Sequence, residues 1–270
     1  MGGIEVGEAG VRKPEHYSGM KVNMPAIEIS NLCKQYRGSL EPALDGLSLR
    51  VRHGAVTGLL GPNGAGKSTT IHILCGMVDA DSGQAAVLGK DCRSETMALR
   101  RELGVVPQQI ALFANLTARE NFRYIGRLYG LDAAVIRRRS DDLLGRLDLL
   151  RHADKRIGRY SGGMKRRANM IASLLHQPEM LILDEPTAGV DVQSRAMILD
   201  FLAEFHAEGK TILYTSHLMD EAQKICDEVV IIDGGKNVVC GTPGELVDRT
   251  PGCRNLEEVF LHYTGHSVRD

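Results

Sequence analysis

Residues 55–68 read AVTGLLGPNGAGKS, an apolar run followed at once by a glycine-rich loop. A continuous apolar run of this kind is typical of a strand that is buried on both faces. The segment STTIHILCGM at 68–77 then has the apolar spacing of a helix, starting from hydroxyl residues suited to a helix N-terminus. The stretch predicts a strand, a loop and a helix, which is the frame of an α/β fold.

The loop matches the pattern GxxxxGK(S/T), and its composition suits phosphate binding. Glycines let backbone N–H groups converge on phosphate oxygens without obstruction from Cβ atoms. Lys67 would place its charge on the β- and γ-phosphates of a nucleotide, and Ser68 would offer its hydroxyl to Mg²⁺. A chance glycine-rich turn is the alternative, but the strand before it and the helix after it favour a phosphate site. The expected nucleotide-binding residues are Gly61, Pro62, Asn63, Gly64, Ala65, Gly66, Lys67, Ser68 and Thr69.

A second apolar strand, at 180–183, ends in the carboxylates Asp184 and Glu185. The carboxyl edge of a parallel sheet would bring them beside the phosphate loop. Asp184 would hold Mg²⁺ through water, because a hard cation prefers oxygen ligands. Glu185 would then be free to polarise the water that attacks the γ-phosphate. Solvated acids in a turn are the alternative for this segment alone, and its pairing with the loop favours nucleotide hydrolysis.

Strand patterns occupy both ends of the chain, and helical patterns fill its middle. The expected strands lie at 26–32, 47–51, 55–60, 180–186, 210–216 and 229–235. Residues 102–176 are mostly helical in pattern, with candidate helices at 121–131, 135–150 and 164–177. Helical stretches at 193–208 and 217–226 separate the later strands, as βαβ units require. We therefore expect a sheet that is discontinuous in sequence.

Composition and charge exclude several classes of protein. The 33 Lys and Arg residues against 34 Asp and Glu residues leave no long-range positive field that would gather nucleic acid. The six cysteines form no CxxC pair, which argues against zinc and a disulfide framework and favours reduced thiols in the cytosol. No stretch approaches the roughly 18 to 20 apolar residues of a membrane span. Contact with a membrane is expected only through a partner.

Residues 160–167, YSGGMKRR, resemble the signature of the ATP-binding cassette (ABC) family, usually written LSGGQ. In the family this motif begins a helix ahead of the acidic strand end, as it does here. A hydroxyl at 161 would cap that helix, and its free amides would make an anion site. The resemblance implies that this site binds the γ-phosphate of ATP held by the opposite subunit. The signature residues are Ser161, Gly162, Gly163 and Met164. Met164 replaces the usual Gln, and Tyr160 replaces the usual Leu.

Four further matches occur in the order of the family. Gln108, after Pro107, resembles the Q-loop glutamine that senses Mg²⁺ and the γ-phosphate. Asp191, at the end of AGVD, resembles the D-loop residue at the dimer interface. His217, after strand TILYTS, resembles the switch histidine that contacts the γ-phosphate and the attacking water. Tyr36 resembles the aromatic residue that stacks on adenine, a contact of about 1 to 3 kcal/mol. A structural histidine and a packing tyrosine are the plainer alternatives.

The resemblance implies an α/β fold: a P-loop NTPase core with a mostly parallel sheet, an N-terminal antiparallel β subdomain and an inserted α-helical subdomain at about 102–176. The resemblance covers an ABC ATPase domain at 26–235 and a C-terminal extension at 236–270. Residues 1–25 are glycine-rich, polar and without a periodic pattern, and are expected to be a disordered tail or a misassigned start. The implied activity is ATP hydrolysis. The implied catalytic residues are Glu185, His217 and Gln108, and the implied Mg²⁺ residues are Ser68, Gln108 and Asp184.

The resemblance also implies partners. A second copy of the chain would complete two ATP sites in a head-to-tail dimer, and separate transmembrane permease subunits would hold it at the cytoplasmic face of the membrane. A cleft near Phe113, Leu116 and Tyr124 would receive a short helix of the membrane partner, with core packing as the alternative for each residue. No nucleic-acid partner is expected.

The C-terminal sequence LEEVFLHYTG, together with YSGGMKRR and DEPTAGVD, resembles the ABC-2 type exporter branch, which includes drug-resistance ATPases. An importer ATPase, a soluble ABC protein of DNA repair or translation, and a regulatory module without turnover stay as alternatives. The basic runs at 137–139 and 165–167 are expected on solvated helix faces.

Overall fold

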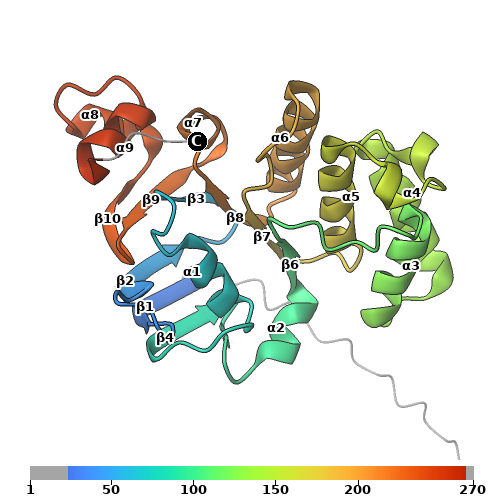
Figure 1. Ribbon diagram of the computed structural model, residues 1–270, viewed down its shortest axis with the longest axis horizontal. Helices are drawn as coiled ribbons and strands as arrows, with labels where there is room; N and C mark the ends of the chain where they lie inside the picture. The colour runs from blue at the N-terminus through green and yellow to red at the C-terminus, as the bar shows by residue number, and fades with distance from the viewer. Residues whose placement is uncertain (1–23, 266–270) are drawn as a thin grey trace, which may run out of the picture.

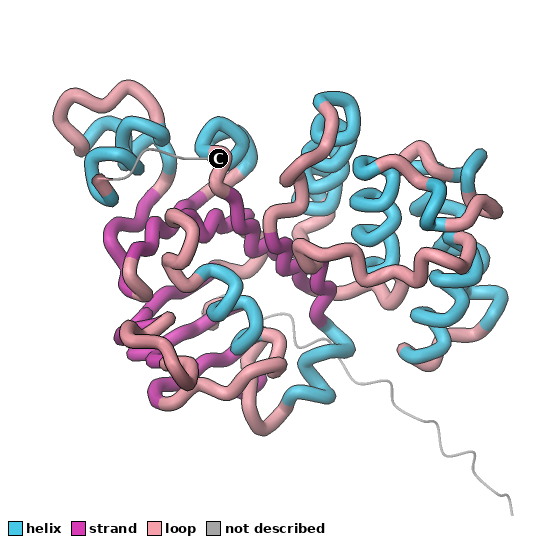
Figure 2. The backbone as a smooth tube through the Cα atoms, in the orientation of Figure 1, coloured by secondary structure: helices cyan, strands magenta, loops and turns pink. Residues whose placement is uncertain are grey.

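The computed structural model describes residues 24–265 and builds them around two sheets, with a group of helices on one side (Figures 1 and 2). The tail predicted at 1–25 lies outside the described residues except for its last two positions, and the end of the C-terminal extension, 266–270, also lies outside them.

Sheet A is antiparallel and formed by the N-terminal part of the chain. Its strands, in spatial order, are β2 (Leu44–Val51), β1 (Ile27–Lys34), β4 (Ser82–Val87) and β5 (Lys90–Asp91). Alternate residues of β2 are buried, as expected where one face of a strand covers a core and the other meets water. The N-terminal antiparallel β subdomain expected from the resemblance is confirmed.

Sheet B is parallel apart from one edge strand, which confirms the expected core. Its strands, in spatial order, are β10 (Lys236–Gly241), β9 (Glu228–Asp233), β3 (Val56–Leu60), β8 (Thr211–Ser216), β7 (Met180–Asp184) and β6 (Leu103–Val106). Every residue of β3, β7 and β8 is buried, which explains the apolar runs at β3 and β7 and the lack of an alternating polar face in β8. β10 is the antiparallel edge strand.

Sheet B separates two hydrophobic cores, because successive side chains of a strand point to opposite faces. Leu59 packs in a core shared with sheet A and helix α1 (Lys67–Leu74), whereas its neighbour Leu60 packs in a core shared with the helices on the other face. In β7, Ile182 and Leu183 divide in the same way. Sheet B therefore contributes side chains to both cores, and it joins sheet A on one face to the helices on the other.

The helical part contains α3 (Ala118–Leu128), α4 (Ala133–Arg146) and α5 (Gly162–Leu174). Figure 1 shows these helices gathered on the side of the molecule away from sheet A. Within the range 102–176 expected to be mostly helical, the structure places a strand, β6, which pairs with β7. Its four residues are too few for apolar periodicity to distinguish strand from helix.

The remaining helices follow sheet B or connect its strands. They are α2 (Thr96–Glu102), α6 (Val192–Ala207), α7 (Met219–Ile225), α8 (Pro243–Arg249) and α9 (Leu256–Thr264). The sequence did not predict α2 and α8, nor the strands β4, β5 and β10. No helix within residues 24–265 has the length and apolar character needed to cross a bilayer.

Candidate functional site

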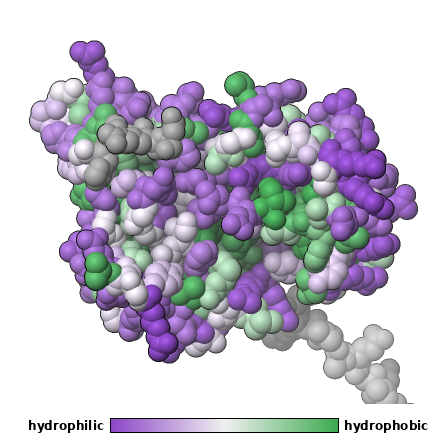
Figure 3. Space-filling view, viewed as in Figure 1, coloured by the Kyte–Doolittle hydropathy of each residue, from purple (hydrophilic) through white to green (hydrophobic). Residues whose placement is uncertain are grey.

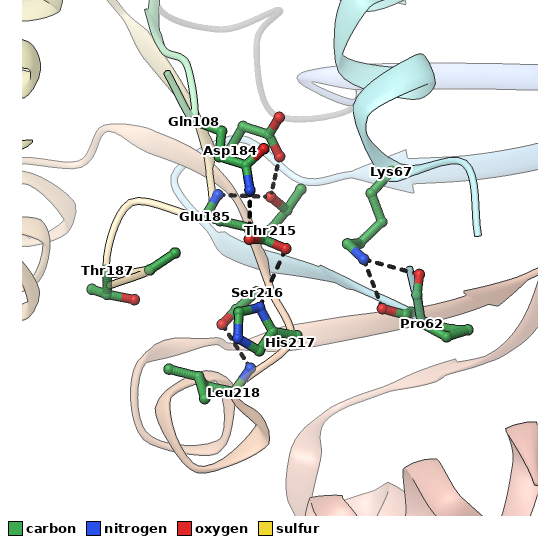
Figure 4. A network of polar contacts seen from close by, with 12 residues as sticks. Pro62, Lys67, Gln108, Asp184, Glu185, Thr187, Thr215, Ser216, His217 and Leu218 are labelled. Carbon is green, nitrogen blue, oxygen red and sulfur yellow. Dashed lines mark hydrogen bonds and ion pairs between the residues drawn. The ribbon is translucent and has the colours of Figure 1, made fainter. Parts of the chain in front are cut away.

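The carboxyl ends of three neighbouring strands of sheet B bring the predicted chemical groups together. The phosphate loop follows β3, Asp184 ends β7, and His217 follows β8. β8 lies between the other two strands, with Leu60 opposite Ser216 and Asp184 opposite Thr215. Groups from distant parts of the sequence therefore meet at one edge of the sheet (Figure 4).

The phosphate loop closes around its own lysine. Lys67 is only 6% exposed, and its Nζ donates hydrogen bonds to the carbonyl oxygens of Gly61 (2.7 Å) and Pro62 (3.1 Å). Burial lowers the pKa of Lys67 below its ordinary value, and the negative charges of Glu185 and Asp184 oppose this shift. The loop thus holds a cation with no carboxylate bonded to it, a group suited to a phosphate.

Two glycines of this loop cannot be replaced without displacing backbone. A Cβ atom at Gly61 would lie 2.4 Å from the carbonyl oxygen of Ile232, and one at Gly66 would lie 2.5 Å from that of Ala43. Gly66 also has φ of 103° and is the N-cap of α1, with no side-chain cap. The expectation that hydroxyl residues begin this helix was wrong. The chain needs a left-handed residue at the turn, and Ser68 lies inside the first turn.

Ser68 and Asp184 form a pair of oxygen groups beside the loop. Ser68 Oγ donates to Asp184 Oδ2 at 3.2 Å, and Thr215 Oγ1 donates to Asp184 Oδ1 at 2.9 Å. Asp184 is 7% exposed. A hydroxyl and a carboxylate at the start of a helix that follows a phosphate loop are the oxygen ligands that Mg²⁺ prefers. The residues present therefore fit a magnesium–nucleotide complex.

Glu185 is the meeting point of the predicted catalytic residues. Gln108 Nε2 donates to Glu185 Oε2 at 3.0 Å, and His217 Nδ1 lies 3.3 Å from Glu185 Oε1 (Figure 4). The backbone of Glu185 has φ of 47°, a conformation that costs free energy in a residue other than glycine. Its N–H donates to Thr215 Oγ1 at 3.0 Å. One hydroxyl, that of Thr215, thus fixes both acids.

A buried carboxylate that the sequence did not single out lies behind this site. Glu221, on α7, is 1% exposed and accepts hydrogen bonds from Thr187 Oγ1 (2.6 Å) and from Tyr214 Oη. It also pairs with Arg195 Nε at 3.2 Å. Burial raises the pKa of Tyr214 well above its ordinary value, and the Glu221 charge adds to this. No sequence motif predicts the role of Glu221, because its three partners come from separate segments of the chain: the loop after β7, the strand β8 and the helix α6.

The signature begins α5 as expected. Ser161 is the N-cap, and its Oγ accepts a hydrogen bond from Met164 N at 3.2 Å. A Cβ atom at Gly163 would lie 2.1 Å from Ser194 Oγ and 2.8 Å from Asp191 Oδ2. Glycine at 163 therefore allows the start of α5 to pack on the start of α6.

Asp191 and Tyr36, two other predicted site residues, lie on the surface. Asp191 is the N-cap of α6, where its carboxylate accepts from Ser194 N (2.8 Å) and Ser194 Oγ (2.9 Å). The hydrogen bonds from Ser194 lower the pKa of Asp191. The ring of Tyr36 is 41% exposed, with Lys34 Nζ 5.8 Å from its centre. This leaves the ring free to stack on a base.

The basic run at 165–167 does not form a solvated face, which corrects the expectation from sequence. Arg166 and Arg167 are 8% and 7% exposed. Arg167 Nη1 donates to the carbonyl oxygen of Leu147 at 2.7 Å, and Arg166 reaches the segment around Gln108. The error arises because α5 is enclosed on several sides, so that guanidinium groups there find carbonyls in place of water. In the run at 137–139, Arg139 Nη1 donates to Leu175 O at 2.8 Å.

Comparison with known proteins identifies the family. Residues 44–188 match the family model described as ABC transporter. The chain is 42% identical over 226 residues to the linearmycin resistance ATP-binding protein LnrL of Bacillus subtilis, covering 84% of this chain and 72% of the relative. It is 42% identical over 233 residues to the Nod factor export ATP-binding protein I of Ralstonia nicotianae, covering 86% and 72%.

Among solved structures, the chain is similar to an ATP-binding subunit of an ABC transporter. The TM-score is 0.80 and the sequence identity 28%, over 88% of this chain and 99% of the other. The match in fold agrees with the match in sequence, and the family model covers the phosphate loop, Gln108, the signature and Asp184–Glu185. The chain belongs to the ABC transporter family and carries its ATPase domain.

Proposed function

We propose that this chain is the ATP-hydrolysing subunit of an exporter, working as a head-to-tail dimer beneath separate transmembrane subunits. The observation that carries the proposal is the convergence of Gln108 and His217 on Glu185, next to the Ser68–Asp184 pair. The relatives named above are described as resistance and export proteins, which favours export over import. A partly buried glutamate with two polar partners also favours turnover over a regulatory module.

The residues divide the work in the following way. Lys67 exchanges the carbonyls of its own loop for the β- and γ-phosphates of ATP, with the loop amides beside it. Ser68, Asp184 and Gln108 would hold Mg²⁺, which would supply positive charge against the phosphates of ATP. Glu185 orients and deprotonates the attacking water, and His217 contacts both that water and the γ-phosphate. Tyr36 stacks on adenine.

The signature supplies the other half of each site to the opposite subunit. Figure 1 shows α5 and α1 on opposite sides of β7, so a signature that acts on phosphate is best placed for a neighbouring molecule. The amides of Gly162 and Gly163 lie at the N-terminus of α5, where Ser161 accepts from the amide of Met164, and such a helix start suits an anion. A two-fold dimer would contain two such composite sites, with Asp191 near their boundary.

Mixing two inactive variants tests the composite site. Lys67→Ala removes the phosphate loop function and Ser161→Arg blocks the signature. A mixed dimer would contain one site with both substitutions and one with neither. An equimolar mixture should therefore recover roughly a quarter of wild-type ATP turnover, if dimers form at random and sites act independently. The measurement is steady-state phosphate release. A mixture no more active than its separate components would contradict shared sites.

An exposed apolar surface suits the membrane partner. The rings of Phe113 and Tyr124 are 53% and 49% exposed and meet edge to face, with centres 5.3 Å apart. Asn121, fully buried, holds the backbone of Phe113 through bonds to both its N–H (2.8 Å) and its carbonyl oxygen (3.1 Å). Hydrophobic side chains gather on this part of the molecule (Figure 3). We propose that this surface, with Leu116, receives a cytoplasmic helix of the transmembrane subunit.

Site-specific crosslinking tests this docking. A photoreactive residue at Phe113 should crosslink to the transmembrane subunit in the assembled complex, whereas the same residue at the exposed Met97 on α2 should not. The readout is the mass shift of the transmembrane subunit after irradiation. Equal crosslinking at the two positions would argue against a defined docking surface and against attachment of the chain to the cytoplasmic face through this contact.

A further inference from the structure

One arginine of the signature helix contacts two of the loops that form the site. Arg166 Nη1 donates hydrogen bonds to the carbonyl oxygens of Gln108 and Pro107, the latter at 3.3 Å, and Nη2 lies 3.5 Å from the carbonyl oxygen of Ala188. The first two residues follow β6 and the third follows β7. A single guanidinium group therefore joins α5 to the segments on both sides of Glu185.

A second residue of α5 fixes the same segment. Asn169 lies one helical turn after Arg166 and is 3% exposed. Its Nδ2 donates to Pro107 O at 3.3 Å, and its Oδ1 accepts from Ala111 N at 3.0 Å. The segment 107–111 is thus held to α5 at both of its ends, and Arg166 determines where the backbone of Gln108 lies.

The side chain of Gln108 links the backbone held by Arg166 to Glu185, the proposed base. Its backbone carbonyl is bound by Arg166, while its Nε2 donates to Glu185 Oε2 at 3.0 Å. Moving the backbone would change the direction from which the amide meets the carboxylate. Arg166 itself touches neither Glu185 nor the phosphate loop through any hydrogen bond or ion pair recorded within residues 24–265.

The chemistry of arginine explains why this position is not a lysine. A guanidinium group is planar and presents several N–H groups in a fixed fork, so it can serve carbonyls on two loops at once. A lysine ammonium is a compact charge and cannot span the same set of acceptors. Arg166 is only 8% exposed, yet its hydrogen bonds go to carbonyl oxygens, with the carboxylates of Glu185 and Asp184 acting only at longer range.

We propose that Arg166 is a positioning residue for ATP hydrolysis, a clamp that fixes Gln108 against Glu185 and ties this contact to the orientation of the signature helix. The inference rests on the roles proposed above for Gln108 and Glu185. The clamp transmits the position of α5 to the site of chemistry, so that a displaced signature helix leaves the base without its partner.

The test is steady-state ATP turnover of the full chain with Mg²⁺. Arg166→Gln should lower kcat about tenfold, because a small misplacement of a catalytic group has a large effect on rate, while KM for ATP changes less than about twofold. In a Gln108→Ala background the same substitution should change kcat by less than about twofold, since the path through Gln108 is already lost. Arg166→Lys should resemble Arg166→Gln, because it keeps the charge without the fork.

Arg167→Lys is the matched control. It alters a neighbouring buried guanidinium that bonds to Leu147, and its kcat should stay within about twofold of wild type. Thermal unfolding verifies that each variant is folded. Wild-type kcat in Arg166→Gln or Arg166→Lys, or losses that multiply with Gln108→Ala, overturns the clamp alone. Full turnover in Gln108→Ala overturns the clamp together with the role of Gln108.

Discussion

Glu185→Gln should lower ATP turnover at least about a hundredfold and leave ATP binding intact. The substitution keeps the shape of the side chain, so it can still contact Gln108 and His217. It removes the basic oxygen that would take a proton from water. The phosphate loop and the Ser68–Asp184 pair are untouched, so nucleotide should bind as in the wild type. ATP that is bound but not hydrolysed should hold the composite sites closed.

The measurement combines phosphate release with light scattering in the presence of Mg²⁺ and ATP. The variant should accumulate as an ATP-dependent dimer, whereas the wild type should return to its starting size as ATP is consumed. Glu204→Gln, a change at an exposed carboxylate on α6 that pairs with Arg146, is the control and should keep wild-type turnover. Undiminished turnover in Glu185→Gln would remove this residue from the proposed mechanism.

Lys67→Ala should abolish measurable nucleotide binding at concentrations that saturate the wild type. The ammonium group is the cation of the phosphate loop, and it lies near two carboxylates. Without it, the negative charges of Asp184 and Glu185 near the γ-phosphate would no longer be offset by the lysine. A charged hydrogen bond of this kind contributes about 1.5 to 3 kcal/mol, and the loss of neutralisation adds to it.

The stability of the nucleotide-free protein separates this effect from unfolding. Burial disfavours the charged form of Lys67 in the folded chain and lowers its pKa, so removing the ammonium group also removes this desolvation penalty. We expect the midpoint of thermal unfolding to stay within about 4 °C of wild type. Titration with a fluorescent ATP analogue gives the affinity. Lys210→Ala, which removes a surface ion pair with Glu179, is the control. Wild-type affinity in Lys67→Ala would contradict the proposed phosphate site.

Motifs with a local physical cause could be predicted from the sequence. The phosphate loop needs glycine wherever a Cβ atom would meet backbone. Gly61 and Gly66 are two such positions, and they belong to the motif by which the loop is predicted from the sequence. The buried strands β3 and β7 appear as apolar runs because both faces are covered. Ser161 indicates the start of α5, because a hydroxyl at an N-cap satisfies an otherwise free amide.

Features that depend on tertiary packing could not be predicted. Arg166 and Glu221 are polar residues on helices, a pattern that usually indicates a solvated face. Their burial is decided by loops that come from other parts of the chain, namely 107–108 for Arg166 and Thr187 for Glu221. The strand β6 is likewise defined by its pairing with β7 and not by its four residues.

The contact between the starts of α5 and α6 has a mechanical consequence. Gly163 packs so closely on Ser194 and Asp191 that not even a methyl group would fit between them. The two helix ends cannot slide past one another or separate by rotation without losing this fit. A displacement of the start of α5 therefore has to be shared by the start of α6 if this fit is kept. If the signature binds the ATP of a neighbouring subunit as proposed, a force on the start of α5 would also act on the start of α6, and through α6 on the core that this helix covers.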